Sequence, residues 1–158
     1  MLIVRPGDKV DKLIAQYSIF LAGPTPRDEK GIDWRPEAID IFESLEFNGT
    51  LFIPSPFLTI NNSHSENYFH QIDWEERALR AATIVMFWVP RDLQTMPAFT
   101  TNVEFGMYVG SGKMVYGRPV INYSKPPKTG YLDWHAQKNN VPILDTLEET
   151  ILTAINLL

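Results

Sequence analysis

Two glutamates, Glu104 and Glu75, stand where carboxyl groups could do chemistry. Glu104 is the one acidic residue of the segment 100–113 (TTNVEFGMYVGSGK), which follows an apolar segment at 83–89 (TIVMFWV). Open α/β sheets commonly bind ligands where a buried strand passes through a loop into a helix. We expect a helix at 102–111 with Glu104 in its first turn, where the helix dipole would keep the carboxylate ionised. An ionised carboxylate suits a nucleophile.

The same spacing has a purely structural alternative. Thr101 and Glu104 form a T-x-x-E pattern, which is typical of a capping box that closes the start of a helix. Three glycines follow and allow a close approach of the backbone: Gly106, Gly110 and Gly112. Lys113 is predicted to mark the helix exit, where a cation suits the dipole, rather than to bind a substrate.

Glu75 belongs to a predicted helix at 68–82. At 100° per residue the apolar side chains of this helix form one broad arc, made of Phe69, Ile72, Ala78, Leu79 and Ala82. Glu75 falls near the middle of that arc, where burial would raise its pKa and suit it to act as a general acid. The alternative is a rotated helix that exposes Glu75 to solvent.

The other side of this helix carries charged residues. Asp73 and Arg77 make a plausible i,i+4 pair, and Glu76 is within reach of Arg80. Asp73 is the reserve candidate for the catalytic acid. One ionised and one protonatable carboxyl are the equipment for retaining glycosyl chemistry, in which one attacks the anomeric carbon and the other manages the proton of the leaving group.

The loop 23–27 (GPTPR) is expected to reach the same end of the sheet. Its predicted substrate contacts are Gly23, Pro24, Thr25 and Arg27. Arg27, and Arg35 at the next helix start, could hold a phosphate or a sugar oxygen, although each taken singly is more often a surface residue. Trp34 is predicted to contact the ligand and Trp88 to be a core residue.

Composition excludes several classes of function. A net charge of −5 argues against nucleic acid as the main partner. The absence of cysteine excludes disulfides, thiolate zinc sites and cysteine nucleophiles. No Walker loop or G-x-G-x-x-G motif indicates ATP or NAD, and His64, His70 and His135 lack metal-ligand spacing. No apolar run approaches the roughly 18 residues of a membrane span. We therefore expect a cytoplasmic protein without cofactor, metal or membrane partner.

Alternating apolar and amphipathic segments predict the elements that position these groups. The expected strands are 17–22, 51–53, 83–89, 114–123 and 141–144, with an edge element within 1–16. The expected helices are 34–47, 68–82, 102–111, 131–138 and a last one up to 158, with N-caps at Asp33 and Asp145. The pattern predicts a single α/β domain over residues 1–158. It would be a flavodoxin-like or Rossmann-like three-layer sandwich with a mostly parallel five-stranded sheet.

Several short motifs occur in this framework. They are FLAGP at 20–24, Trp74-Glu75 before the TIVMFWV strand, and VEFG at 103–106 with SGK at 111–113. Together they resemble the nucleoside 2-deoxyribosyltransferase-like superfamily, over roughly residues 17–122. WRPEA at 34–38 and FWVP at 87–90 are similar to its less characterised 2-deoxyribosyltransferase-like branch. The superfamily includes deoxyribosyltransferases and deoxynucleoside 5′-monophosphate N-glycosidases.

The resemblance implies that Glu104 is a nucleophile forming a covalent glycosyl-enzyme, and that Glu75 replaces an aspartate that handles the base and its proton. Residues 99–102 (FTTN), with Thr101 and Asn102 among them, fall near the sugar, where the family has an acidic residue, and Phe20 stands where it has a tyrosine. A nucleoside or nucleotide substrate and a homo-oligomer are also implied. Two other functions remain open, a non-catalytic nucleotide-sensing module and a flavin-binding flavodoxin-like domain.

Overall fold

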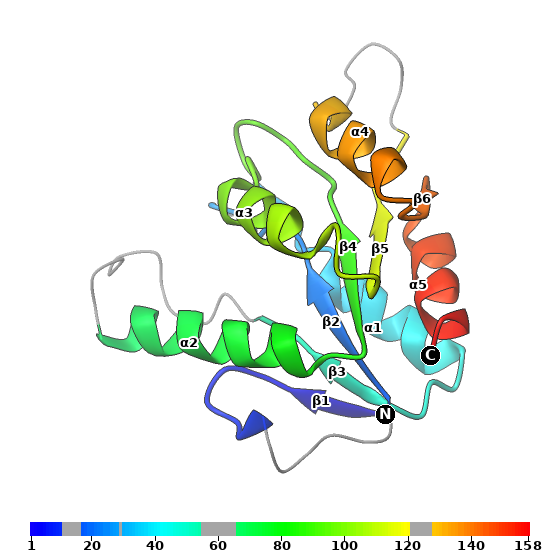
Figure 1. Cartoon of the computed structure of the whole chain (residues 1–158). Helices are drawn as coiled ribbons and strands as arrows, with labels where there is room; N and C mark the ends of the chain where they lie inside the picture. The colour runs from blue at the N-terminus through cyan, green and yellow to red at the C-terminus, as the bar shows by residue number, and fades with distance from the viewer. Residues whose placement is uncertain (11–16, 29, 55–65, 121–127) are drawn as a thin grey trace.

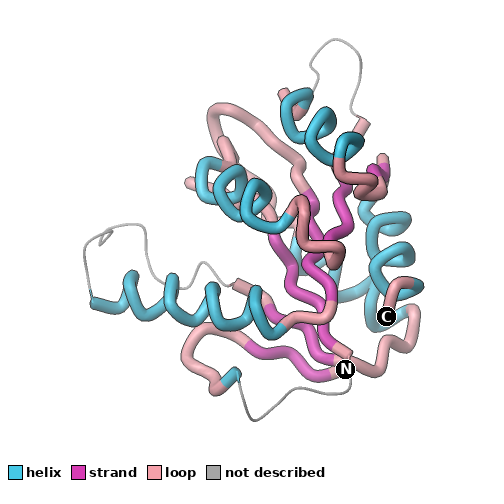
Figure 2. Tube along the Cα trace, viewed as in Figure 1, coloured by secondary structure: helices cyan, strands magenta, loops and turns pink. Residues whose placement is uncertain are grey.

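A parallel sheet runs through the centre of the protein (Figures 1 and 2). The computed structural model describes residues 1–10, 17–28, 30–54, 66–120 and 128–158. Within these ranges the sheet has six strands in the order β1-β3-β2-β4-β5-β6, and every neighbouring pair is parallel. The strands are β1 Leu2–Val4, β2 Ser18–Ala22, β3 Thr50–Phe52, β4 Ile84–Trp88, β5 Met114–Gly117 and β6 Ile143–Leu144.

The predicted count of five strands is too low by one. The edge element expected near the N-terminus pairs with β3, from Leu2 opposite Thr50 to Val4 opposite Phe52. Without β1 the order is the flavodoxin-like 2-1-3-4-5, which has its switch point between β2 and β4. The strand predicted at 114–123 ends at Gly117, and its residues 121–123 lie outside the described ranges.

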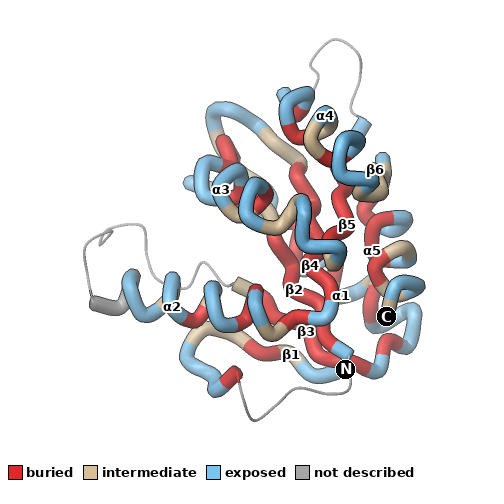
Figure 3. The backbone as a smooth tube through the Cα atoms, in the orientation of Figure 1, coloured by how far each residue is buried: buried red, intermediate tan, exposed pale blue. Residues whose placement is uncertain are grey.

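Five helices cover the two faces of the sheet within the described ranges, so the predicted three-layer arrangement is confirmed. They are α1 Arg35–Ser44, α2 Glu66–Ala81, α3 Phe99–Tyr108, α4 Gly130–Lys138 and α5 Leu147–Asn156. Along β4 the side chains alternate, with Met86 packed toward α1 and α5, and Phe87 toward α2, α3 and α4. Every residue of β4 is buried (Figure 3), and Trp88 is a core residue as predicted.

The N-terminal caps differ from the prediction by one residue at two helices. Trp34, not Asp33, precedes the first residue of α1, while an Asp33 carboxylate oxygen accepts a hydrogen bond from the Arg35 N–H at 3.2 Å. At α5 the cap is Thr146 rather than Asp145. The Thr146 hydroxyl oxygen accepts from the Glu149 N–H at 3.1 Å and its O–H donates to the Glu149 carboxylate at 2.9 Å.

No described helix combines the length and the apolar character that crossing a membrane requires.

Candidate active site

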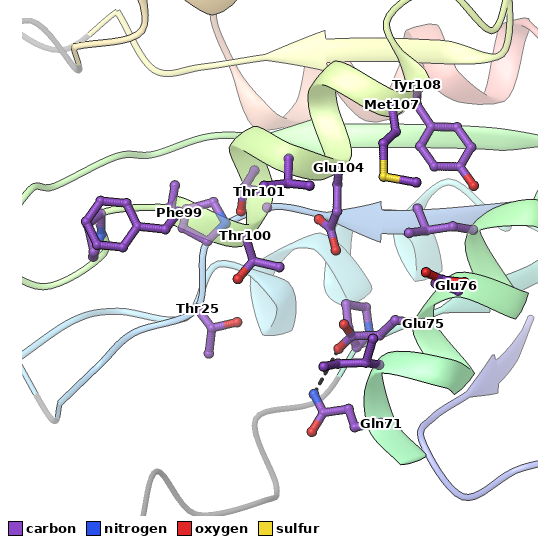
Figure 4. Close-up of a pocket in the computed structure, with 18 of the residues that line it drawn as sticks. Thr25, Gln71, Glu75, Glu76, Phe99, Thr100, Thr101, Glu104, Met107 and Tyr108 are labelled. Atoms are coloured by element: carbon purple, nitrogen blue, oxygen red, sulfur yellow. Dashed lines mark hydrogen bonds between the residues drawn. The ribbon is translucent and has the colours of Figure 1, made fainter. Parts of the chain in front are cut away.

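A cavity of about 380 Å³ opens at the carboxyl ends of β2 and β4, beside the switch point of the sheet (Figure 4). Its walls come from the loop after β2, from Arg35 at the start of α1, from Pro54 after β3, from α2, and from residues 97–108, which include α3. The volume lies within the range of small-molecule sites. Glu75 from α2 and Glu104 from α3 both line it, although they are far apart in the sequence.

Glu104 lies in the second turn of α3 rather than in the first. The helix starts three residues earlier than predicted, because Ala98 takes a left-handed conformation (φ 63°) as its N-cap. Thr101 is therefore already inside the helix and buried, so the capping-box alternative is wrong. The T-x-x-E pattern that does cap a helix is the one formed by Thr146 and Glu149.

The Glu104 carboxyl is half-buried and points into the cavity (Figure 4). It forms no hydrogen bond or ion pair with any residue in the described part of the chain. Burial raises its pKa to about 8, with a further rise from the charge of Glu75 and an opposing effect of Arg35. The prediction that the helix dipole keeps Glu104 ionised is therefore wrong.

Glu75 is also half-buried, so the alternative in which it faces bulk solvent is wrong. Burial raises its pKa, as predicted, and two partners oppose the rise. The Gln71 side-chain N–H donates to the Glu75 carboxylate at 2.8 Å (Figure 4), and the positive charge of Arg35 acts in the same sense. The negative charge of Glu75 adds to the raised pKa of Glu104, so the two carboxyls titrate as a coupled pair.

The predicted apolar arc of α2 is only partly correct. Ala78, Leu79 and Ala82 are buried, whereas Phe69 and Ile72 are 60% and 37% exposed. In Figure 1 the first turns of α2 extend beyond the strands, so the sheet cannot cover the side chains there. The exposed Ile72 is free to line the cavity instead.

Asp73 does not reach the cavity. Its side chain is 69% exposed and pairs with Arg77 at 3.4 Å, as the i,i+4 spacing predicted. The structure therefore removes Asp73 from the catalytic candidates. The second expected pair, Glu76 with Arg80, also forms, at 3.1 Å, and both of its members line the cavity.

The loop after β2 reaches the cavity, as predicted for Gly23, Pro24, Thr25 and Arg27. A β-carbon at Gly23 would lie 2.2 Å from the backbone oxygen of Trp88, so only glycine lets the loop pass this close to β4. The Arg27 guanidinium lies over the ring of Phe99, 5.0 Å from its centroid. A cation is thus present at the end of the cavity formed by this loop.

Two predicted ligand contacts are buried next to this loop. Trp34 is 4% exposed, lies in the core and donates its ring N–H to the Pro24 carbonyl at 3.2 Å, so the predicted contact with a ligand is wrong. Arg35 does line the cavity, but its guanidinium is already bonded to the loop: it donates to the Gly23 carbonyl at 2.9 Å and to the Thr25 hydroxyl at 3.4 Å.

Of the four residues placed near the sugar by resemblance, Phe99, Thr100 and Thr101 line the cavity. The Asn102 side-chain oxygen instead accepts a hydrogen bond from the Arg91 guanidinium, on another side of α3. Asn102 is therefore not part of this site.

The family match agrees with this geometry. Residues 16–119 match the family described as "nucleoside 2-deoxyribosyltransferase like". The chain belongs to this family. The matched stretch contains every residue that lines the cavity. Among curated proteins, none matches the sequence significantly.

Sequence reasoning missed several residues of this deoxyribosyltransferase-like cavity. The missed residues with polar, thioether or aromatic side chains include Gln71, Met107 and Tyr108. Gln71 precedes Glu75 by four positions and Tyr108 follows Glu104 by four. Residues spaced i,i+4 share a helix face, so this spacing was the signal that could have found both.

Lys113 has a structural role in this family member. Its ammonium donates to the carbonyls of Leu79, Arg80 and Ala82, at 2.8, 3.1 and 3.0 Å. It is thus a cation at a helix exit, as predicted, but the helix is α2 rather than α3. The close approach expected at the three glycines is not seen at Gly106 or Gly112, which have nothing within 4 Å of a built β-carbon; Gly112 serves a left-handed turn (φ 75°).

Across the described ranges, no group of three or more His, Asp and Glu side chains is arranged to hold a metal ion. Of the three histidines considered, His64 lies outside those ranges.

Proposed function

We propose that the protein cleaves or exchanges the N-glycosidic bond of a nucleoside or nucleotide through a covalent glycosyl intermediate on Glu104. One observation carries the proposal: two half-buried carboxyl groups, from α2 and α3, line one cavity at the switch point of the sheet. Membership of the deoxyribosyltransferase-like family supports the same chemistry.

In the first step a Glu104 oxygen attacks C1′ of the sugar. The C1′–O bond forms as the C1′–N bond breaks, and the electron pair of that bond leaves with the base. Glu75, when protonated, gives its proton to the departing nitrogen. Both groups act directly on substrate atoms, so no cofactor is needed.

In the second step water or another base attacks C1′ of the glycosyl ester. Glu75, now a carboxylate, takes the proton of the attacking molecule, and the C1′–O bond to Glu104 breaks. This returns both carboxyls to their starting state. Water gives hydrolysis and a second base gives transfer, and exclusion of water from the cavity favours transfer.

Attack requires the charge on Glu104 and the proton on Glu75, whereas burial raises the pKa of both carboxyls in the free protein. Glu104 therefore has to lose its proton before the reaction. Positive charge develops at C1′ in the transition state, so an ionised Glu104 beside C1′ is stabilised there more than in the free site. Interactions that strengthen only in the transition state are the ones that raise kcat.

Arg27, Thr25 and Thr101 are proposed to hold the sugar side of the substrate. All three line the cavity, and Arg27 brings a positive charge to the loop end of it. A guanidinium and hydroxyl groups suit a sugar oxygen or a phosphate.

The direct test is incubation with a panel of nucleosides and their 5′-monophosphates, followed by chromatography for free base. An analogue with an electronegative substituent next to C1′ slows breakdown of the intermediate. We expect the mass of the protein to rise by one glycosyl group, and peptide mapping to place that group on Glu104. Base release that persists unchanged in Glu104→Ala would remove the covalent mechanism, and a glycosyl group found on Glu75 would exchange the two roles.

The second candidate is a nucleotide-sensing module that has kept the cavity and lost turnover. Two observations favour it: the raised pKa of Glu104 to about 8, and the buried Phe20, which has no hydroxyl to offer. Binding of a nucleotide without release of base from any member of the panel would support this function over the enzyme.

We also propose that the protein forms a homo-oligomer in the cytoplasm. The apolar rim that α3 gives to the cavity supports self-association, since Phe99, Val103 and Met107 line the cavity at successive turns and are each more than 60% exposed. Light scattering on the purified protein tests the assembly, and a monomer at micromolar concentration would contradict it.

A further inference from the structure

Arg35 combines nearly complete burial with a place in the cavity wall. It is 3% exposed, and arginine is rarely buried so deeply unless its charge is paired. The ion pair recorded for it in the described part of the chain is with Asp33, at 3.2 Å, and the Asp33 side chain is itself 28% exposed. A partly solvated carboxylate offsets the cost of a buried charge only in part.

The remaining contacts of Arg35 are with uncharged groups. Its guanidinium donates to the carbonyls of Gly23 and Pro24, at 2.9 and 3.4 Å, and to the Thr25 hydroxyl at 3.4 Å. Its Nε–H is buried and has no hydrogen-bond partner among the described residues. These bonds fix the guanidinium and the loop in one geometry, but they add no negative charge.

Further negative charge is available on Glu75 and Glu104, which line the same cavity as Arg35. We propose that Arg35 is a positioning residue for this pair: its charge stabilises the one negative charge that the two carboxyls share, and its donors hold the 23–25 loop against them. This inference rests on the proposed function, in which a singly protonated pair is the reactive form.

Electrostatics agree with this geometry. Arg35 lowers the pKa of both Glu75 and Glu104, and their charges in turn oppose the lowering of the Arg35 pKa by burial. The other titratable groups that line the cavity are Arg27, Glu76, Arg80 and Tyr108. Glu76 and Arg80 pair with each other at the surface, so they add little net charge to the site.

The test compares Arg35→Met, which removes the charge, with Arg35→Lys, which keeps it but loses the planar fork. In Arg35→Met we expect the alkaline limb of kcat/KM to move up by about one pH unit, and kcat/KM to fall about 100-fold. In Arg35→Lys kcat/KM falls about tenfold while the limb stays in place. Arg77→Met, at an exposed arginine, is the matched control and changes neither value.

A second variant covers the case in which Arg35→Met does not fold. Asp33→Asn keeps an oxygen acceptor for Arg35 but removes the neighbouring negative charge. The positive charge of Arg35 then acts on the carboxyl pair with less opposition, so the limb should move to lower pH. A limb that stays in place in a folded Arg35→Met, or in Asp33→Asn where Arg35→Met does not fold, overturns the inference.

Carbon-13 NMR titration of the glutamate carboxyls gives a readout that does not need turnover, with Glu104→Gln to identify the Glu104 signal. A shifted Glu104 titration in Arg35→Met, in a protein that releases no base from any substrate, supports the role of Arg35 and contradicts the proposed function. An unshifted titration in folded Arg35→Met, in a protein that does release base, contradicts the role of Arg35 alone.

Discussion

Charged side chains cluster at two places at the carboxyl end of the sheet. In only one of them do the described carboxyl groups all have hydrogen-bond or ion-pair partners. Beyond β5, Asp133 of α4 accepts hydrogen bonds from the Tyr116 hydroxyl at 2.8 Å and from the Arg118 guanidinium at 3.3 Å. Arg118 also pairs with Asp145, next to the cap of α5. Beyond β2 and β4, the Glu104 carboxyl has no such partner among the described residues and opens into a cavity.

The difference shows which arrangement of charge marks a site. The polar network around Asp133 joins β5, α4 and the start of α5, and its groups use their hydrogen-bonding capacity on one another. The Glu104 carboxyl keeps its capacity for a ligand, and burial in the cavity wall raises the pKa of both Glu104 and Glu75. We therefore expect substitutions in the cavity to change chemistry and substitutions around Asp133 to change stability.

The largest expected effect is at Glu104. Glu104→Gln keeps the shape of the side chain but removes the nucleophile, so kcat should fall by at least about 10³-fold in single-turnover assays of base release. Circular dichroism should show an unchanged fold. If Glu104→Gln keeps more than a tenth of the activity, the cavity does not use this carboxyl as a nucleophile.

Glu75→Gln should cost less, about 10²-fold in kcat, because it removes proton transfer but leaves the nucleophile in place. The loss should be greatest for substrates whose base is a poor leaving group. Asp73→Asn is the matched control on the same helix, and we expect less than a twofold change, since Asp73 is exposed and paired with Arg77. Equal losses in the two variants would contradict the assignment of Glu75.

Most of the fold could be predicted from the sequence, because buried parallel strands show as apolar runs and their helices as periodic segments. Glu104 and Glu75 were found in the same way, as acidic residues in apolar surroundings. The start of α3 could not be predicted, since it depends on a left-handed conformation at Ala98, a residue that rarely takes one. The burial of Trp34 could not be predicted either. The same Trp-Arg sequence is compatible with a ligand contact and with hydrogen bonds that support a loop.

Substitutions in the polar network around Asp133 should change the stability of the protein and not its activity. Asp133→Ala leaves the buried Tyr116 hydroxyl without this acceptor, at a cost of about 2 kcal/mol in the free energy of unfolding. Denaturant unfolding measures the loss, and kcat/KM at a temperature where the variant is folded should match that of the unchanged protein. A change in kcat/KM without a change in stability would mean that the network reaches the cavity.

The smallest expected effect is a pH-dependent change in the stability of Glu104→Gln. It should distinguish the cavity from the polar network around Asp133. The Glu104 carboxyl has a pKa of about 8 in the folded protein and an ordinary value near 4.5 when unfolded. Below the lower value it is neutral in both states and costs nothing. As the pH rises toward 8 only the unfolded state gains by ionising, so the folded state loses stability through that window. Glu104→Gln removes this loss and should therefore stabilise the protein by about 1–2 kcal/mol at pH 8.5 and negligibly at pH 4.5.

The measurement is the melting temperature of Glu104→Gln and of Asp133→Ala at pH 4.5 and pH 8.5, each compared with that of the unchanged protein. Asp133→Ala should lower the melting temperature at both, because it removes hydrogen bonds, whereas Glu104→Gln should raise it only at the higher pH. If a substitution abolishes activity and raises stability, the replaced carboxyl is unfavourable for folding and serves ligand binding or catalysis. Replacing a structural carboxyl lowers the stability of the protein instead. A Glu104→Gln protein that is destabilised at pH 8.5 would place Glu104 with the structural group around Asp133.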